Sequence, residues 1–133
     1  MKIMIDTNIL ISSIVFKGKV YNLVKYLLES EHEIYVSEYV EQEFKEKIYK
    51  KWTAKAELYL ERYQVAPFIH CESTTKILGA LRDEKDIPVL SDAIYHNVDI
   101  LLTGDKDFLE SNIEVPLILS PAMLIKGLEE GYF

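Results

Sequence analysis

Two aspartates directly follow short apolar runs. Asp6 follows Ile3-Met4-Ile5, and Asp105 follows Ile100-Leu-Leu-Thr103 after one glycine. Apolar runs without alternation are typical of strands in a parallel sheet, which are buried on both faces. In such sheets, ligands bind outside the carboxyl ends of the strands. The two aspartates are therefore expected at one edge of the sheet, where their carboxylates would bind a cation, although either one could simply cap the turn that follows it.

Glu43 is near the start of a helix that should lead away from the same edge. Ser37 is a typical N-cap residue after the predicted strand at residues 34–36, so the helix is predicted to begin at Glu38. Its inward stripe consists of Val40, Phe44 and Ile48. Glu43 borders that stripe, since successive helical residues turn by about 100°. A solvated glutamate is the simpler interpretation, but the position near the carboxyl edge also favours a functional role.

Asp86 heads another predicted helix, with Pro88 in its first turn. The inner side of this helix is predicted to consist of Val89, Leu90, Ala93 and Ile94. Asp86 should point along that side, either as an N-cap or as a member of the acidic site. Asp92 is on a different face of the helix and is expected to be exposed. Asp107 is close enough to Asp105 to assist it, or it could cap a short helix.

Convergence of Asp6, Glu43, Asp86 and Asp105 would place four carboxylates within a few ångströms of one another. Their repulsion would raise some of their pKa values and destabilise the fold in the absence of a cation. Oxygen ligands without His or Cys select Mg²⁺ or Mn²⁺ rather than zinc. Such an ion would activate the attacking water and stabilise charge on a phosphate, which suits phosphodiester hydrolysis.

The elements that must position these acids alternate between strand and helix. Helices are predicted at residues 9–15, 20–29 and 53–64 and from Ser120-Pro121 to about residue 131, with a strand at 117–119. Residues 68–71 are either a short strand or an extended link, 73–81 a weak helical turn, and 104–112 a loop or short helix. The order predicts an α/β fold in a single domain, residues 1–133, with a mainly parallel sheet of four to five strands flanked by helices on both faces.

Several side chains outside the acidic set are expected to be buried. Helical spacing turns Leu23, Tyr26 and Leu27 inward in one helix, and Ala56, Tyr59, Leu60 and Tyr63 in another. Trp52 is expected to pack inside a helix–helix junction. His70 and Cys71 are expected to be a buried strand pair, because no other Cys or spaced His offers a zinc site.

The composition is that of an ordinary globular domain. The chain has 133 residues, of which 49% are hydrophobic and 28% charged, and no run approaches the 18 apolar residues of a membrane span. A single Cys fits a reducing cytoplasm. The net charge of −7 argues against a protein that simply coats nucleic acid, since phosphate binding needs a basic surface.

One basic run offsets the acidic balance. It lies just after Glu43, is interleaved with Tyr49 and Trp52, and consists of Lys45, Lys47, Lys50, Lys51 and Lys55. A solvated helix face is the simpler interpretation. The run could also form a lip that holds a substrate beside the acids.

The four acids, in this order and context, make the chain resemble the PIN domain, a metal-dependent ribonuclease family that includes VapC-type toxins. The resemblance extends from residue 2 to about residue 120. It is closest to the branch of toxin components, in the runs Arg82-Asp-Glu-Lys-Asp86 and Thr103-Gly-Asp105. The matching signatures are Ile5-Asp-Thr-Asn-Ile-Leu10, Ser37 through Glu43-Phe44, Asp86 through Ala93, and Thr103-Gly-Asp-Lys-Asp-Phe108.

The resemblance implies an endoribonuclease, the toxin of a type II toxin–antitoxin pair, that uses Mg²⁺ or Mn²⁺. Asp6, Glu43, Asp86 and Asp105 would be the catalytic and metal-binding acids. The supporting polar residues would be Thr7, Asn8, Thr103 and Asp107, and a shift of register would put Asp83 in the site in place of Asp86.

The implied partners are RNA, a small antitoxin protein and a second copy of the chain, which exposed Tyr132 and Phe133 could contact. The remaining alternatives are a catalytically silent scaffold with the same fold and a housekeeping RNA-processing nuclease. A phosphoacceptor receiver domain fits less well, because Asp6 stands alone after the first strand rather than in an acid pair.

Overall fold

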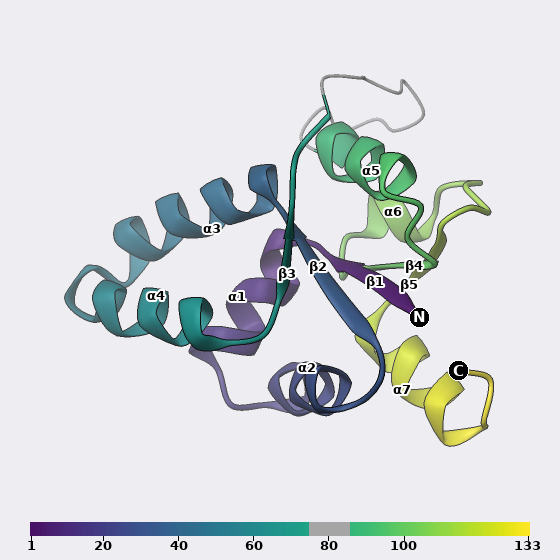
Figure 1. Cartoon of the computed structure of the whole chain (residues 1–133), viewed down its shortest axis with the longest axis horizontal. Helices are drawn as coiled ribbons and strands as arrows, with labels where there is room; N and C mark the ends of the chain where they lie inside the picture. The colour runs from purple at the N-terminus through teal and green to yellow at the C-terminus, as the bar shows by residue number, and fades with distance from the viewer. Residues whose placement is uncertain (75–85) are drawn as a thin grey trace.

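The computed structural model describes residues 1–74 and 86–133. Five short strands form one parallel sheet in the order β3-β2-β1-β4-β5 (Figure 1). The strands are β1 (Lys2–Ile5), β2 (Glu33–Ser37), β3 (Ile69–Cys71), β4 (Ile100–Leu102) and β5 (Leu117–Leu119). The predicted α/β fold with a mainly parallel sheet is confirmed, and the segment at residues 68–71 contains a strand rather than a link.

Helices connect the strands and cover both faces of the sheet. They are α1 (Thr7–Val15), α2 (Lys19–Glu29), α3 (Glu38–Lys51), the 3₁₀ helix η1 (Thr53–Lys55), α4 (Ala56–Val65), α5 (Asp86–Tyr95), α6 (Lys106–Leu109) and α7 (Pro121–Glu129). The predicted helix at 53–64 is therefore divided in two, with Trp52 and a 3₁₀ turn between α3 and α4.

The chain reverses its direction across the sheet between β1 and β4. From β1 it proceeds outward to β2 and β3, and α5 then carries it back across the sheet to β4, from which it continues to β5. Right-handed crossovers therefore place α1 to α4 on one face and α5 and α6 on the other, as Figure 1 shows. The carboxyl ends of β1 and β4 form the topological switch point, where open α/β sheets bind their ligands.

The centre of the core is β1. Ile3, Met4 and Ile5 are fully buried, as expected for a strand covered on both faces. In α3, the inward stripe of Val40, Phe44 and Ile48 is also fully buried. These apolar positions fix the register that brings residue 6 and residue 103 to the same edge.

Several predicted burials are wrong. Tyr26 and Ile94 are exposed. The buried face of α2 and that of α5 are narrower than the apolar stripes in their sequences suggest. His70 is also exposed, since β3 is an edge strand, and its neighbour Cys71 is only half-buried. Phe133 is half-buried and packs over Gly127, whereas Tyr132 is exposed as expected.

Some expectations lie outside the described residues. They concern the helical turn beyond residue 74 and the acid Asp83. Among the helices of residues 1–74 and 86–133, none combines the length and the apolar character needed to cross a membrane.

Candidate active site

Asp6 lies at the switch point and is buried. Its backbone nitrogen donates to the Leu102 carbonyl at 3.1 Å, which continues the pairing of β1 with β4. One carboxylate oxygen, Oδ1, accepts from Thr7 N at 2.7 Å and caps α1, so that helix begins two residues earlier than predicted. The other oxygen, Oδ2, accepts from the Thr103 hydroxyl at 2.8 Å. Asp6 is thus both a helix cap and a buried carboxylate at the carboxyl edge.

Two threonines connect Asp6 to two of the other predicted acids. The Thr7 hydroxyl donates to Glu43 Oε1 at 2.5 Å, which brings α3 against the start of α1. The Thr103 hydroxyl accepts from the Asp105 backbone nitrogen at 3.1 Å. The structure therefore brings Glu43 and Asp105 close to Asp6. Two consecutive hydrogen bonds connect each of them to Asp6, through Thr7 and Thr103 respectively.

The pKa of Asp6 reflects its burial first and its acidic neighbours second. Burial raises the pKa of Asp6 above its usual value, the hydrogen bonds from Thr103 and Thr7 oppose the rise, and the charges of Glu43 and Asp105 add to it. A bound cation would favour the charged form of Asp6, which its burial and the charges of Glu43 and Asp105 disfavour. The donors are all hard carboxylate oxygens, so the chemistry of the set fits Mg²⁺ or Mn²⁺.

The fourth predicted acid, Asp86, is the first residue of α5. Its side chain, like the whole of the alternative residue Asp83, lies outside the described part of the structure. Among the side chains that the structure does describe, no three His, Cys, Asp or Glu groups are arranged to hold a metal ion on their own.

The supporting residues differ in their contacts. Asp107 donates its backbone nitrogen to Asp105 Oδ1 at 2.8 Å, so Asp105 caps α6. Thr103 is fully buried and Thr7 almost so. Asn8 is exposed in the first turn of α1, and no hydrogen bond joins its side chain to another residue of the described ranges.

Asp92 was predicted to be exposed, and that prediction is wrong because its side chain is fully buried. Its carboxylate accepts from the Ser73 hydroxyl at 2.8 Å and the Thr74 backbone nitrogen at 2.6 Å, and the Ser37 hydroxyl is a further hydrogen-bond partner. Burial raises the pKa of Asp92, and these hydrogen bonds oppose the rise. Asp92 thereby links α5 to the ends of β2 and β3. The helical spacing of the apolar residues did not predict this role.

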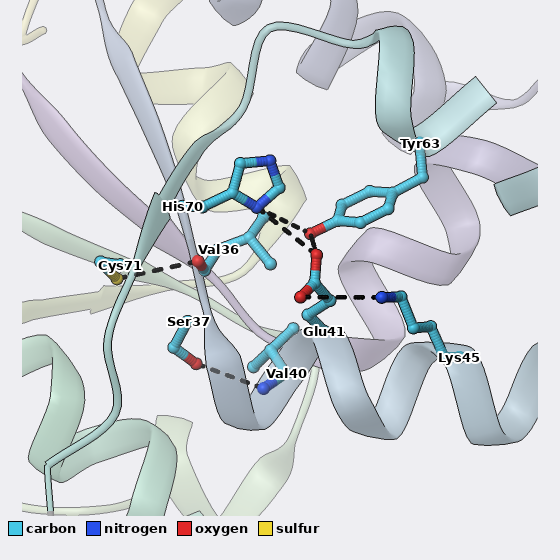
Figure 2. A network of polar contacts seen from close by, with 8 residues as sticks. All are labelled: Val36, Ser37, Val40, Glu41, Lys45, Tyr63, His70 and Cys71. Carbon is cyan, nitrogen blue, oxygen red and sulfur yellow. Dashed lines mark hydrogen bonds and ion pairs between the residues drawn. The ribbon is translucent and has the colours of Figure 1, made fainter. Parts of the chain in front are cut away.

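A second polar network lies on the other side of α3 (Figure 2). The Tyr63 hydroxyl donates to Glu41 Oε1 at 2.8 Å and lies 3.1 Å from His70 Nδ1. Lys45 Nζ is 3.9 Å from Glu41 Oε2. Burial and the Glu41 carboxylate raise the pKa of Tyr63. The network ties α3 and α4 to the edge strand β3, away from Glu43.

The two acids of α3 thus face different neighbours. Glu41 and Glu43 are separated by two residues, or about 200° around the helix. Lys45 shares the side of Glu41, whereas Lys47 and Lys50 follow Glu43 at spacings of four and seven residues and share its side. The predicted basic run is therefore divided between two surfaces of α3.

Comparisons with known proteins concern the family and the fold of the chain. A family model described as PIN domain matches residues 2–107. The structure of VapBC2 from Rickettsia felis, bound to a DNA fragment from their promoter, superposes with a TM-score of 0.69. The two sequences are 19% identical, and the superposition covers 90% of this chain and 98% of the matched chain. No curated protein sequence shows a significant match.

Proposed function

This chain belongs to the PIN domain family, and on that premise we propose that it is a divalent-metal-dependent endoribonuclease. The observation that carries the proposal is the buried Asp6 at the switch point. It is linked to Glu43 through the backbone nitrogen and hydroxyl of Thr7, and to Asp105 through the hydroxyl of Thr103. The pKa of Asp6 is raised by its burial and, to a smaller extent, by the charges of Glu43 and Asp105, and carboxylates with raised pKa values of this kind are often found in functional sites.

Asp6, Glu43 and Asp105, together with Asp86, would hold Mg²⁺ or Mn²⁺. When bound, the ion supplies an activated water and stabilises the charge that develops on the phosphate. The chain's own contribution is to position the acids. Thr7 and Thr103 fix the carboxylates of Glu43 and Asp6 by hydrogen bonds, so little reorganisation is needed when the substrate arrives.

Asn8 and Asp107 would complete the polar surroundings. Asn8 is exposed next to Thr7, where it could contact the substrate backbone. Asp107 follows Asp105 in the first turn of α6, within reach of the same edge as an additional ligand.

The RNA would approach along the Glu43 side of α3. Lys47 and Lys50 extend from Glu43 along one stripe of the helix, and Lys51 lies at the end of α3. Phosphate contacts from such lysines would give local attraction despite the net charge of −7. Lys45, whose ammonium lies near Glu41, belongs to the opposite side and is assigned no RNA contact.

The proposed biological role is that of the toxin in a type II toxin–antitoxin pair, acting on RNA in the cytoplasm as a homodimer. It is supported by the likeness of the fold to VapBC2. The partner would then be a small antitoxin protein. A housekeeping RNA-processing nuclease and a catalytically silent scaffold are the alternatives, and the second is disfavoured because Asp6, Glu43 and Asp105 lie together.

The decisive experiment is a titration of RNA cleavage with Mn²⁺ and Mg²⁺. Wild type should cleave single-stranded RNA only when metal is present. Asp6→Asn should lose at least ~100-fold in rate, since it removes a charged ligand and leaves a side chain of the same shape. Circular dichroism should show that the variant is folded.

A matched control makes the same chemical change at the opposite edge of the sheet. Asp99 is exposed there and accepts from Lys2 N at 2.8 Å. Asp99→Asn should cleave at the wild-type rate. Full activity of Asp6→Asn, or no cleavage by wild type at any metal concentration, contradicts the nuclease assignment, and the second result favours the scaffold.

A further inference from the structure

Helices α1 and α3 run side by side from the acid site to an aromatic pair. At the start of α1, Thr7 donates to Glu43 in the first half of α3, and just past the ends of the two helices the ring of Phe16 lies 5.9 Å from that of Trp52. Both pairs join residues 36 apart in sequence, so the two helices keep the same alignment over their length. Nine residues of helix place the aromatic pair about 14 Å from the Thr7–Glu43 contact.

The aromatic pair combines an open ring with a rigid support. Phe16 is 55% exposed, although it follows a helix that is otherwise well buried. Trp52 is half-buried, packs against the core and meets Phe16 edge to face at 75°. Tyr59 supports Trp52 at 6.4 Å, and the Arg62 guanidinium lies 5.5 Å from the Tyr59 ring. The pair is therefore held in place while Phe16 stays open to a ligand.

Lysines lie close to this pair in the sequence. They are exposed, lie just after α1 or near the junction of α3 and α4, and consist of Lys17, Lys19, Lys50, Lys51 and Lys55. None of the five forms an ion pair with a residue in the described ranges. Positive charge beside an exposed aromatic ring is the combination with which proteins bind single-stranded nucleic acid.

We propose that Phe16 and Trp52 form a stacking platform for an unpaired base of single-stranded RNA. This proposal rests on the nuclease function and deepens it, because it names the residues that would bind an unpaired base of the substrate. The strand would cross the acid site, follow Lys47 and Lys50 along α3, and place a base a few nucleotides away on the Phe16 ring. A base can stack on an aromatic side chain only when it is free of its own duplex, so the platform selects single strands over duplexes.

The test uses Trp52, the only tryptophan of the chain, as an internal reporter. Binding is measured in the Asp6→Asn variant, so that it does not depend on cleavage. A ~10-nucleotide single-stranded RNA should quench the Trp52 emission and bind tightly, whereas a duplex of the same sequence should do neither. Phe16→Ala should weaken binding of the single strand by roughly 10-fold or more, as loss of one stacked base predicts.

Matched variants separate stacking from other effects. Phe16→Tyr keeps a ring and should restore binding, whereas Tyr26→Ala removes an equally exposed aromatic from α2 and should have no effect. In cleavage-competent protein, Phe16→Ala should raise KM and leave kcat nearly unchanged. Phe16→Leu, which keeps an apolar contact with Trp52, replaces the alanine variant if that one has a lower melting temperature.

The outcomes distinguish the platform from the nuclease function. Cleavage by wild type together with unchanged RNA affinity in Phe16→Ala overturns the platform only, and would assign the exposed ring to a protein interface. Ring-dependent RNA binding without cleavage by wild type overturns the nuclease function and keeps the platform. Absence of RNA binding together with absence of cleavage by wild type overturns both.

Discussion

Thr7 and Thr103 are the residues whose importance the structure changes most. From the sequence they are only polar neighbours of two acids. In the structure, each hydroxyl lies between two segments that are far apart in the chain, Thr7 with Glu43 and Thr103 with Asp6. A threonine after a strand carries no signal that identifies its partner, because the partner depends on which strand lies beside it. The sequence predicted that Asp6, Glu43 and Asp105 would lie near one another, but it did not predict the threonine hydroxyls that connect them.

Asp92 is a residue whose burial was predicted wrongly from the sequence. Its place six residues after Asp86 put it on a different helix face, and that face was assumed to be solvated. The assumption failed because the ends of β2 and β3 cover α5 there and supply hydroxyl and amide donors to the carboxylate. A buried acid with neutral donors has no signature in a hydrophobic pattern, which records only apolar side chains.

Asp92 should make the stability of the protein depend on pH. Because its pKa is raised in the folded protein, the native state binds a proton more tightly than the unfolded chain does. The contribution of Asp92 to the unfolding free energy should therefore decrease as pH rises above about 3.9, by about 1.4 kcal/mol for each unit of pKa difference. Asp92→Asn keeps polar partners for Ser73 and Thr74 but does not titrate.

Urea denaturation of both proteins between about pH 4 and pH 7 checks this prediction. The unfolding free energy of wild type minus that of Asp92→Asn should decrease with rising pH. A difference that is constant with pH, or that increases, would show that Asp92 does not titrate at a raised pKa in the folded state.

At the scale of elements, α3 separates two kinds of site. Its apolar stripe was predicted correctly, since Val40, Phe44 and Ile48 repeat at one clear spacing. The polar residues on either side of that stripe have no such period. Their assignment required α1 on one flank and α4 with β3 on the other, which is information about packing rather than about the helix.

The division of the α3 lysines predicts different effects for the same charge reversal. Lys47→Glu and Lys50→Glu should each weaken RNA binding and lower the slope of log Kd against log salt by roughly 0.7 for each lost phosphate contact. Lys45→Glu, on the Glu41 side, should leave the slope unchanged. Fluorescence anisotropy over a range of salt concentrations measures all three. Equal slopes for Lys45→Glu and Lys47→Glu would place the RNA elsewhere.

Helix α2 illustrates why a stripe can be overestimated. Leu23 and Leu27 are buried, but Tyr26, one residue from Leu27, is exposed beside the groove between α2 and α7. Helical spacing gives the direction of the buried face but not its width. The width depends on how much of the helix its neighbours cover.

At the scale of the whole molecule, alternation of strand and helix was enough to predict a parallel α/β sheet. The strand order β3-β2-β1-β4-β5 was not predictable from it, because alternation does not specify which strands lie side by side. The order determines where the chain reverses, and hence why Asp6 and Asp105 meet while the carboxyl end of β3 carries a different network.

The crowding of acids at the switch point predicts that metal stabilises the whole fold. At a concentration 100 times its Kd, Mn²⁺ should add about 2.7 kcal/mol to the unfolding free energy. In a domain of 133 residues this corresponds to a rise of roughly 10 °C in Tm. Asp6→Asn should lose most of that rise, and Asp99→Asn should keep it. Differential scanning fluorimetry with and without EDTA provides the measurement, and an equal rise in both variants would place the ion elsewhere.

The central position of β1 in the sheet also determines when the acid site can form during synthesis of the chain. Ile3 pairs with Ile100, and Asp6 receives a hydrogen bond from Thr103. The first strand, β1, therefore cannot complete its contacts until the fourth strand, β4, has been synthesised. At about 5–20 residues per second, roughly 5–20 s pass between translation of Asp6 and translation of Asp105. During that interval a growing chain carries some of the acids but not the assembled site, because Asp6 lacks its hydrogen bond until Thr103 has been synthesised.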